Sequence, residues 1–234
     1  GSIPNDTGLI KNANNSPWLN SKPFQKDISK LLDRTIYCEN DANCFALSEA
    51  KDGSASHYKI VFGVILGSGC GGGLVVDRKI ISGINNLSGE WGHNPLPYYG
   101  INEDISVIQS TLSKNISIEK FISGKGLESL YFENFKKKLS TKEIFSKKKE
   151  NAKFINDFLN RIARSLSLLI NTVDPDAIVF GGGVSNEIEN LDLLRDMTGN
   201  FVGKKNIKTS FIKPKFGDAS GVRGAAILGR NTIY

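Results

Sequence analysis

The sequence of 234 residues lacks long hydrophobic runs and contains few cysteines. Its longest apolar runs, such as residues 60–66, are far too short to span a bilayer, so no membrane partner is expected. The amino terminus shows no secretory signal pattern. The three cysteines form no C-x-x-C pair, and their odd number argues against a disulfide framework. These absences predict a protein of the reducing cytoplasm.

Signals for nucleic-acid binding are also missing, although the formal net charge is +6. The excess is concentrated in two lysine runs, residues 136–138 and 147–149, in a segment whose apolar residues recur at helical spacing. This pattern is typical of a solvated helix face. The sequence has no zinc-finger spacing and no basic patch rich in aromatic residues, so we expect no nucleic-acid partner.

The residues that are present are typical of an α/β protein, with 39% hydrophobic residues and 24 glycines. The length allows one large domain or two modest lobes. Apolar spacing predicts helices at residues 24–33, 42–51, 119–138, 152–172 and 221–230. Strands are predicted at residues 35–38, 59–66 and within 174–183, with a hairpin turning at Asp77-Arg78 and a loop over 98–118.

A glycine-rich stretch follows the strand predicted at residues 59–66. Its glycines match G-x-G-x-x-G, but the next residues are β-branched and predict a hairpin, whereas a dinucleotide site needs a helix there. No Lys-Ser/Thr follows, which excludes a Walker A loop. Backbone N–H groups of such a turn can form an anion nest, and a tight turn that uses glycine to reach positive φ is the alternative. The candidate phosphate contacts are Gly67, Ser68, Gly69, Gly71, Gly72 and Gly73.

A second glycine turn, Gly181–Gly183, follows another β-rich run. Glycine there would let a flat ligand such as adenosine approach the backbone, and an ordinary strand-to-helix turn is the alternative.

Polar side chains with possible chemistry occur at two places. Asn40-Asp41 precedes a predicted helix, either as an ordinary N-cap or as a pair in which Asp41 accepts a proton from a sugar hydroxyl and Asn40 bonds the ring. Glu90 and His93 are three residues apart around Gly92, so one turn could direct both at the same ligand. A carboxylate and an imidazole suit a polyhydroxylated ligand. With the glycine turn, they indicate phosphoryl transfer to a sugar.

The motifs together resemble the ROK family (repressors, open reading frames and sugar kinases), within it the branch of bacterial fructokinases and N-acetylglucosamine kinases. The matching segments run through the whole chain, at residues 11–20, 39–50, 67–74, 89–97, 117–127, 174–183 and 217–226. The resemblance implies an α/β, actin-like ATPase (RNase H-like) fold of two lobes with the active site between them. Residues 1–58 with 224–234 would form what is present of the first lobe, and residues 59–223 the second.

The resemblance also implies the chemistry. It makes Asp41 the general base and places the sugar on Asn40, Glu90, His93 and Glu119, with Asn12 and Asn14 lining the same pocket. ATP phosphates would lie on residues 67–73 and adenosine beside residues 181–183, with Mg²⁺ as cofactor. The implied reaction is phosphorylation of a hexose, with D-fructose converted to fructose 6-phosphate as the expected case, in a possible homodimer.

The chain departs from the family pattern in two respects. Family members carry zinc on the histidine of GExGH and three cysteines, and these cysteines align with Ser110, Leu112 and Ser117. None of the three supplies a thiolate, so no zinc is expected. The family also begins with a strand and a D-x-G-G-T-K type phosphate turn, which this chain lacks, so it looks like a fragment with an incomplete first lobe. A non-catalytic, sugar-responsive transcriptional regulator and an inactive kinase fragment are the alternatives.

Overall fold

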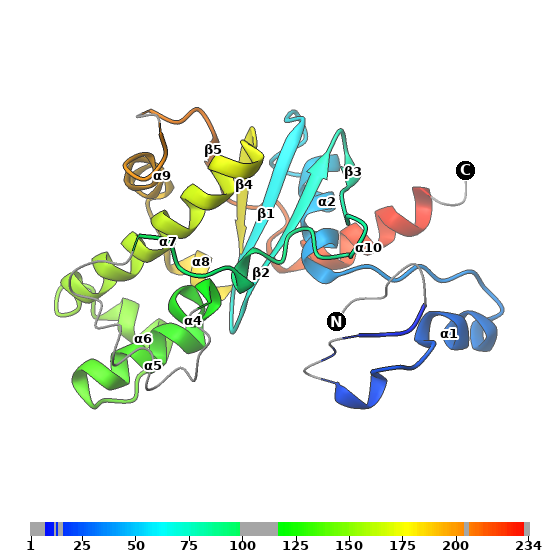
Figure 1. Cartoon of the computed structure of the whole chain (residues 1–234), viewed down its shortest axis with the longest axis horizontal. Coiled ribbons are helices and arrows are strands. Elements are labelled where there is room, and N and C mark those ends of the chain that lie inside the picture. The colour runs from blue at the N-terminus through cyan, green and yellow to red at the C-terminus, as the bar shows by residue number, and fades with distance from the viewer. Residues whose placement is uncertain (1–7, 12, 14–15, 99–116, 204–205, 232–234) are drawn as a thin grey trace.

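The computed structural model describes residues 8–11, 13, 16–98, 117–203 and 206–231 of the chain. Figure 1 shows a central sheet with helices packed around it and an amino-terminal segment, containing α1, that lies apart from the sheet. The helices and short 3-10 turns are η1 (Pro17–Leu19), α1 (Phe24–Leu32), α2 (Asp41–Lys51), η2 (Trp91–His93), α4 (Ile118–Ile122), α5 (Gly124–Phe135), α6 (Thr141–Ser146), α7 (Ala152–Val173), α8 (Gly183–Glu187), α9 (Leu191–Gly199), η3 (Gly217–Ala219) and α10 (Ser220–Asn231). Among these described helices, none is long and apolar enough to cross a bilayer.

The sheet has five strands in the order β3-β2-β1-β4-β5. The strands are β1 (Ile60–Leu66), β2 (Cys70–Val76), β3 (Lys79–Ile80), β4 (Ala177–Gly181) and β5 (Ser210–Ile212). β1, β4 and β5 run parallel to one another. On the other side of β1, β2 pairs antiparallel with β1, and β3 pairs antiparallel with β2. The carboxyl ends of β1 and β4 therefore meet at one edge of the sheet, and both glycine turns begin there.

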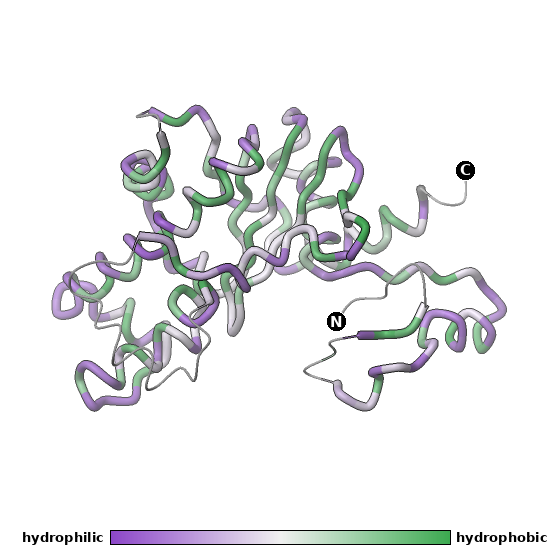
Figure 2. The backbone as a smooth tube through the Cα atoms, in the orientation of Figure 1, coloured by the Kyte–Doolittle hydropathy of each residue, from purple (hydrophilic) through white to green (hydrophobic). Residues whose placement is uncertain are grey.

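Alternating residues of the strands supply two separate hydrophobic cores. Phe62, Val64 and Leu66 point to the side covered by α4, α5 and α7, whereas Val61 and Val75 belong to the core beneath α2. Both faces of the central strands are buried, which explains why β1 is an almost continuous apolar run and does not alternate. Figure 2 shows the same pattern as apolar strands between helices whose outer sides are hydrophilic.

Most of the expected elements are confirmed, including the hairpin at Asp77-Arg78 between β2 and β3. The single helix expected at 119–138 is wrong. The chain forms α4 and α5 there because Ser123 starts a new helix, its Oγ accepting the Gly126 N–H at 3.1 Å. Residues 35–38 are not a strand. The loop expected at 98–118 lies almost entirely outside the described residues.

The two lysine runs are exposed, but they lie at helix ends and do not form a helix face as expected. Residues 136–138 follow α5, and residues 147–149 follow α6. The ammonium groups of Lys136 and Lys138 lie 6.0 and 5.8 Å from the centre of the Phe132 ring. Contacts of this kind at an exposed aromatic ring agree with a solvated surface.

Helix α2 is buried on all sides over residues 42–50, between the sheet and α10. Glycines make this possible: a Cβ on Gly73 of β2 would lie 2.5 Å from the Ala42 carbonyl oxygen and 2.8 Å from the Asn43 Cα. On the opposite side, a Cβ on Gly224 of α10 would overlap the backbone of Cys44. Helix α2 thus packs on its neighbours with backbone against backbone.

The division into lobes at residue 58 stays a prediction.

The far end of α2 is tied to the rest of the chain by one buried carboxylate. Glu49 is fully buried and accepts hydrogen bonds from the N–H groups of Ser54 and Lys215 at 2.9 Å each, and from the Ser220 hydroxyl at 2.7 Å. Burial raises the pKa of Glu49, but hydrogen bonds from the N–H of Lys215 and other donors outweigh it and hold that pKa below the ordinary value of 4.5. The carboxylate is therefore ionised and joins α2 to the start of α10.

We predict that Glu49→Gln lowers the free energy of unfolding at pH 7 by about 1–3 kcal/mol, because an amide cannot satisfy the same set of donors. The pKa of Glu49 is lower in the folded than in the unfolded chain, so its contribution is complete above about 4.5 and is lost as the pH falls through the folded value. Urea unfolding between pH 7 and pH 3 should show a flatter acid slope for this variant. The exposed Glu150→Gln is the control, and an unchanged acid slope in Glu49→Gln would contradict the assignment.

We also predict that Gly73→Ala destabilises the chain by about 1–3 kcal/mol, because the added methyl group meets the backbone of α2 and no flexible side chain can yield. Thermal and urea unfolding measure the loss. Gly203→Ala is the matched control, since nothing lies within 4 Å of its Cβ position. Equal stability of the two variants would show that α2 does not need this close approach.

Candidate active site

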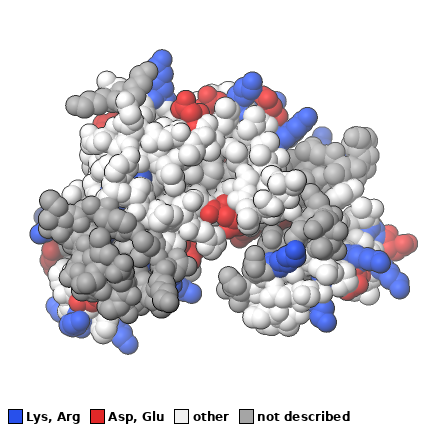
Figure 3. All heavy atoms as spheres, in the orientation of Figure 1, with Lys and Arg blue, Asp and Glu red and all other residues white. Residues whose placement is uncertain are grey.

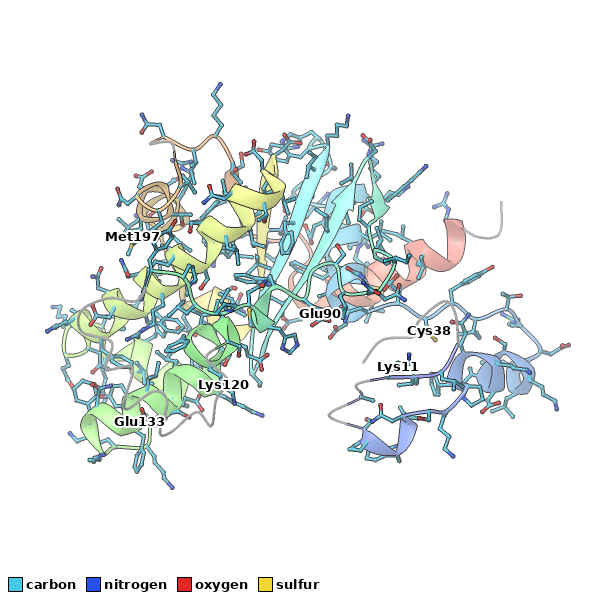
Figure 4. The ribbon with its side chains drawn as sticks, in the orientation of Figure 1. Lys11, Cys38, Glu90, Lys120, Glu133 and Met197 are labelled. Atoms are coloured by element: carbon cyan, nitrogen blue, oxygen red, sulfur yellow. The ribbon has the colours of Figure 1, made fainter. Side chains whose placement is uncertain are left out.

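The amino-terminal half of strand β2 is the place where the candidate residues meet. Three elements approach it: α2, η2 and α4. A Cβ on Gly71 would lie 3.7 Å from the Ala42 Cβ, and one on Gly92 would lie 2.6 Å from the Cys70 carbonyl oxygen. Figure 4 shows Glu90 beside the lower end of β2, on the side that faces the amino-terminal segment with Lys11 and Cys38. In Figure 3 acidic side chains gather at the head of the notch between that segment and the sheet.

Asn40 and Asp41 lie where α2 begins. Asn40 is the N-cap, and its Oδ1 accepts the N–H groups of Ala42 at 2.8 Å and Asn43 at 3.4 Å, which confirms the N-cap interpretation. Asp41 Oδ1 accepts the Ala42 N–H at 2.9 Å, and the residue is exposed. The cap therefore holds the Asp41 carboxylate at the helix start, where a ligand hydroxyl can reach it.

Glu39 supports this helix start and was not among the residues predicted from the sequence. Its Oε1 accepts the Asn40 N–H at 2.8 Å and the Asn43 side-chain amide at 3.0 Å. Its other oxygen accepts the Ser82 hydroxyl at 3.4 Å, which links α2 to the segment after the hairpin. An acid directly before an Asn N-cap was the available signal, and only the structure shows what it binds.

Glu90 and His93 lie on one short turn, as their spacing predicted. Glu90 precedes η2 and His93 ends it, with 3.4 Å between Glu90 Oε2 and His93 Nε2. Trp91, between them, is buried and donates its indole N–H to the Gly71 carbonyl at 2.9 Å. Its ring meets Phe62 edge-on at a centroid distance of 6.4 Å. Trp91 thus anchors the turn on β2 while Glu90 and His93 stay accessible.

Glu119 reaches the same place from α4. The start of α4 is joined to the end of η2 by the bridge between Pro95 and Ser117 and by the Ile118 N–H, which donates to the Asn94 carbonyl at 2.7 Å. Glu119 Oε2 accepts the Cys70 N–H at 2.9 Å. The carboxylate therefore bonds directly to the residue that follows the first glycine turn.

The cysteines near these carboxylates are neutral thiols. Burial, together with the carboxylates of Glu119 and Glu90, raises the pKa of Cys70 well above its ordinary value. Burial, together with Glu39 and Asp41, raises the pKa of Cys44 to about 11. At neutral pH both groups are therefore thiols, which are poor nucleophiles.

The first glycine turn is shorter than the sequence suggested. It comprises Gly67–Gly69, closed by the Gly67 N–H donating to the Gly69 carbonyl at 3.0 Å. Gly71, Gly72 and Gly73 are part of β2 and pair with residues of β1. A Cβ on Gly72 would lie 2.7 Å from the Phe62 ring and 2.8 Å from Trp91. Packing therefore explains the glycines at 72 and 73. The phosphate contacts expected from Gly67 to Gly73 stay a prediction.

The second glycine turn joins β4 to α8, so it is a strand-to-helix turn, and the adenosine contact expected there stays a prediction. Gly182 has φ 91°, a conformation that favours glycine, and its Cβ position overlaps the backbone of Leu66 at the end of β1. The two glycine turns thus lie side by side at the carboxyl edge of the parallel strands, where α/β sheets commonly bind ligands. Nothing lies within 4 Å of the Cβ position of Gly183.

Two sets of predicted residues are not tested by this geometry. Asn12 and Asn14 lie outside the described residues, as do Ser110 and Leu112. Ser117 is buried at the start of α4. The sequence has no cysteine after Cys70, so it lacks the cysteines that the family pattern places at 110, 112 and 117. Within the described ranges, no group of three His, Cys, Asp or Glu residues could hold a metal ion.

Comparison with known proteins places the chain in a family. The model of the ROK family matches residues 1–232. The N-acetyl-D-glucosamine kinase of Histophilus somni is 38% identical over 240 residues, a match that covers 97% of this chain and 77% of the relative. The crystal structure of the ROK hexokinase from Thermus thermophilus superposes with a TM-score of 0.81 at 22% identity, covering 99% of this chain and 78% of that one.

A ROK family glucokinase from Streptomyces griseus, solved in complex with glucose and AMPPNP, has a TM-score of 0.71 at 22% identity and covers 91% of this chain and 74% of its own. The fold is therefore the α/β, actin-like ATPase fold that the resemblance implied. Because the family model matches almost the whole chain, the chain belongs to the ROK family.

Proposed function

We propose that this chain is a sugar kinase that transfers a phosphoryl group from ATP to N-acetyl-D-glucosamine, with Asp41 as the general base. The observation that carries the proposal is the gathering of three accessible or partly accessible carboxylates around the start of β2, next to the Gly67–Gly69 turn. These are Asp41, Glu90 and Glu119. Hydroxyl-rich ligands are bound by such acceptors, and phosphate groups by the N–H groups of a glycine turn.

The choice of sugar rests on the relatives. The Histophilus somni protein is an N-acetyl-D-glucosamine kinase, at an identity that shows family membership over most of both chains. The fructokinase specificity expected from the sequence has no such support, so D-fructose becomes the second candidate. Homodimer formation and a cytoplasmic location stay predictions of the sequence.

The proposed reaction needs one proton acceptor. The sugar hydroxyl oxygen forms a bond to the γ-phosphorus, the bond from that phosphorus to the β–γ bridging oxygen breaks, and ADP leaves. Asp41 takes the hydroxyl proton; a weak base is sufficient because the loose transition state requires the proton to leave late. Glu90, His93 and Glu119 would orient the ring through its other hydroxyls.

The nucleotide is proposed to lie along the edge where the two glycine turns meet. Its phosphates would contact residues 67–69, with the Ser68 hydroxyl as a further donor, and its adenosine would lie beside residues 181–183. Mg²⁺ would bind mainly to the phosphates and would supply charge neutralisation when bound. A transcriptional regulator would bind sugar here without turnover, and the kinase assay separates the two.

We expect Asp41→Asn to lower kcat by about a hundredfold to ten-thousandfold, the range that general acid–base catalysis contributes. Sugar affinity should stay within a few-fold of the unaltered chain, because the amide keeps the shape and the helix start is held by Asn40. Asp77→Asn, in the exposed hairpin turn, is the matched control and should keep full activity. A coupled ADP-release assay and calorimetric sugar titration give both quantities. Retained turnover in Asp41→Asn would remove Asp41 from this role.

We further expect N-acetyl-D-glucosamine to be phosphorylated with a higher kcat/KM than D-fructose. The assay measures ADP release with each hexose under Mg²⁺ and ATP, with D-glucose and N-acetyl-D-mannosamine as further substrates. A preference for D-fructose would return the chain to the fructokinase assignment. If none of the hexoses is phosphorylated, the kinase proposal fails.

A further inference from the structure

Glu119 differs from the other proposed sugar residues because its carboxylate is bound to the phosphate turn. Its Oε2 accepts the Cys70 N–H at 2.9 Å, and it would lie 2.8 Å from a Cβ on Gly69. By contrast, Glu90 Oε2 faces His93 Nε2, and Asp41 Oδ1 accepts an N–H of its own helix. Within the described part of the chain, Glu119 is the one of these three carboxylates whose hydrogen bond links the proposed sugar site to the residue after the glycine turn.

A carboxylate at this point opposes the ligand that the turn is proposed to bind. Phosphate oxygens bind to exposed backbone N–H groups of glycine turns, and the Cys70 N–H follows directly after residues 67–69. Glu119 occupies that N–H with an anionic oxygen, and two like charges at such a short distance repel each other strongly away from bulk water. Without sugar, the N–H group that directly follows the turn is therefore already bound to a negatively charged oxygen.

We propose that Glu119 couples the two substrates: its carboxylate blocks the phosphate turn until a sugar hydroxyl draws it away. A sugar hydroxyl that donates to Glu119 replaces the Cys70 N–H as its partner, and the freed N–H becomes available to a phosphate oxygen. Toward the nucleotide, Glu119 is a positioning residue, since it acts through the turn. The proposal rests on the proposed function for its two ligands.

Sugar and nucleotide must then strengthen each other's binding by the same factor, because coupling free energy is reciprocal. The change in nucleotide affinity on removing Glu119 also distinguishes this coupling from a purely structural role, because the two predict changes in opposite directions. If Glu119 only held the turn in shape, removing it would weaken nucleotide binding. If it blocks the turn, removing it tightens nucleotide binding in the absence of sugar.

The test measures the Kd of AMPPNP with Mg²⁺ by calorimetry, with and without saturating N-acetyl-D-glucosamine, for the chain and three variants. In the unaltered chain, sugar should lower this Kd by about fivefold or more. Glu119→Ala should lower the sugar-free Kd by a similar factor and remove the effect of sugar. Glu119→Gln keeps the shape and an acceptor but not the charge. Its sugar-free Kd for AMPPNP should therefore fall between that of the unaltered chain and that of Glu119→Ala. It also keeps the test valid if Glu119→Ala does not fold.

Glu90→Gln is the matched control. It removes the charge of a neighbouring carboxylate that is proposed to bind sugar but has no hydrogen bond to the turn. We expect it to weaken sugar binding while the sugar-free Kd for AMPPNP stays within twofold of the unaltered chain. An equal tightening in Glu90→Gln would overturn the proposal, because it would reflect the general charge of the site and not the contact to Cys70.

The outcomes separate this coupling from the proposed function. If hexose is phosphorylated but both Glu119 variants bind AMPPNP equally or more weakly without sugar, the coupling is wrong and the kinase assignment stands. If AMPPNP binding depends on Glu119 as described but no hexose is phosphorylated, the kinase assignment fails and the blocking contact stands. If AMPPNP binds to none of the proteins, both are overturned.

Discussion

The site depends on the close approach of helix α2 to strand β2. Gly73 on the strand lies against the backbone of Ala42 and Asn43, with no side chain between them. Because this contact fixes the start of α2, it also fixes the position of the Asp41 carboxylate relative to the glycine turn that precedes the same strand. Gly224 of α10 holds the helix from its opposite side in the same way. The positions of the catalytic candidates thus follow from glycine packing, and any added methyl group at these points moves the helix.

The acidic residues of α2 divide into two kinds with different physical roles. Glu49 is fully buried and surrounded by donors, so its charge is satisfied by the protein and serves to join α2 to η3 and α10. Asp41, at the other end of the helix, is exposed, and its Oδ1 accepts a hydrogen bond from the Ala42 N–H of its own helix. A carboxylate whose acceptors are all used stabilises the fold, and one with an oxygen facing solvent can meet a substrate. Glu119 combines the two, because the bond that it makes without ligand is one that a ligand can replace.

Much of the fold could be predicted from the sequence, and the failures have common physical causes. Periodicity found α7, and a β-rich apolar run indicated β1. It missed α6, α8, α9 and β5, which are short elements stabilised mainly by caps and tertiary contacts. The break between α4 and α5 was missed because a serine can be read as a helix residue or as a cap, and the choice depends on what packs against Gly126. The sequence named Asn40, Asp41, Glu90 and His93 as candidate-site residues, and their roles stay predictions. It did not reveal Glu39 and Trp91, whose contacts to Ser82 and Gly71 join segments that are distant in the sequence.

The sequence by itself determined the local features: the N-cap at Asn40, the turn that carries Glu90 and His93, and the motifs that identify the family. These depend on residues within a few positions of one another, so their spacing contains the information. Only the tertiary structure decided which glycines form the first glycine turn and which are packing sites on β2. It also decided that the Glu119 carboxylate meets the N–H of Cys70, 49 positions away in the chain. Such contacts depend on how strands and helices stack, and no local pattern of residues records that geometry.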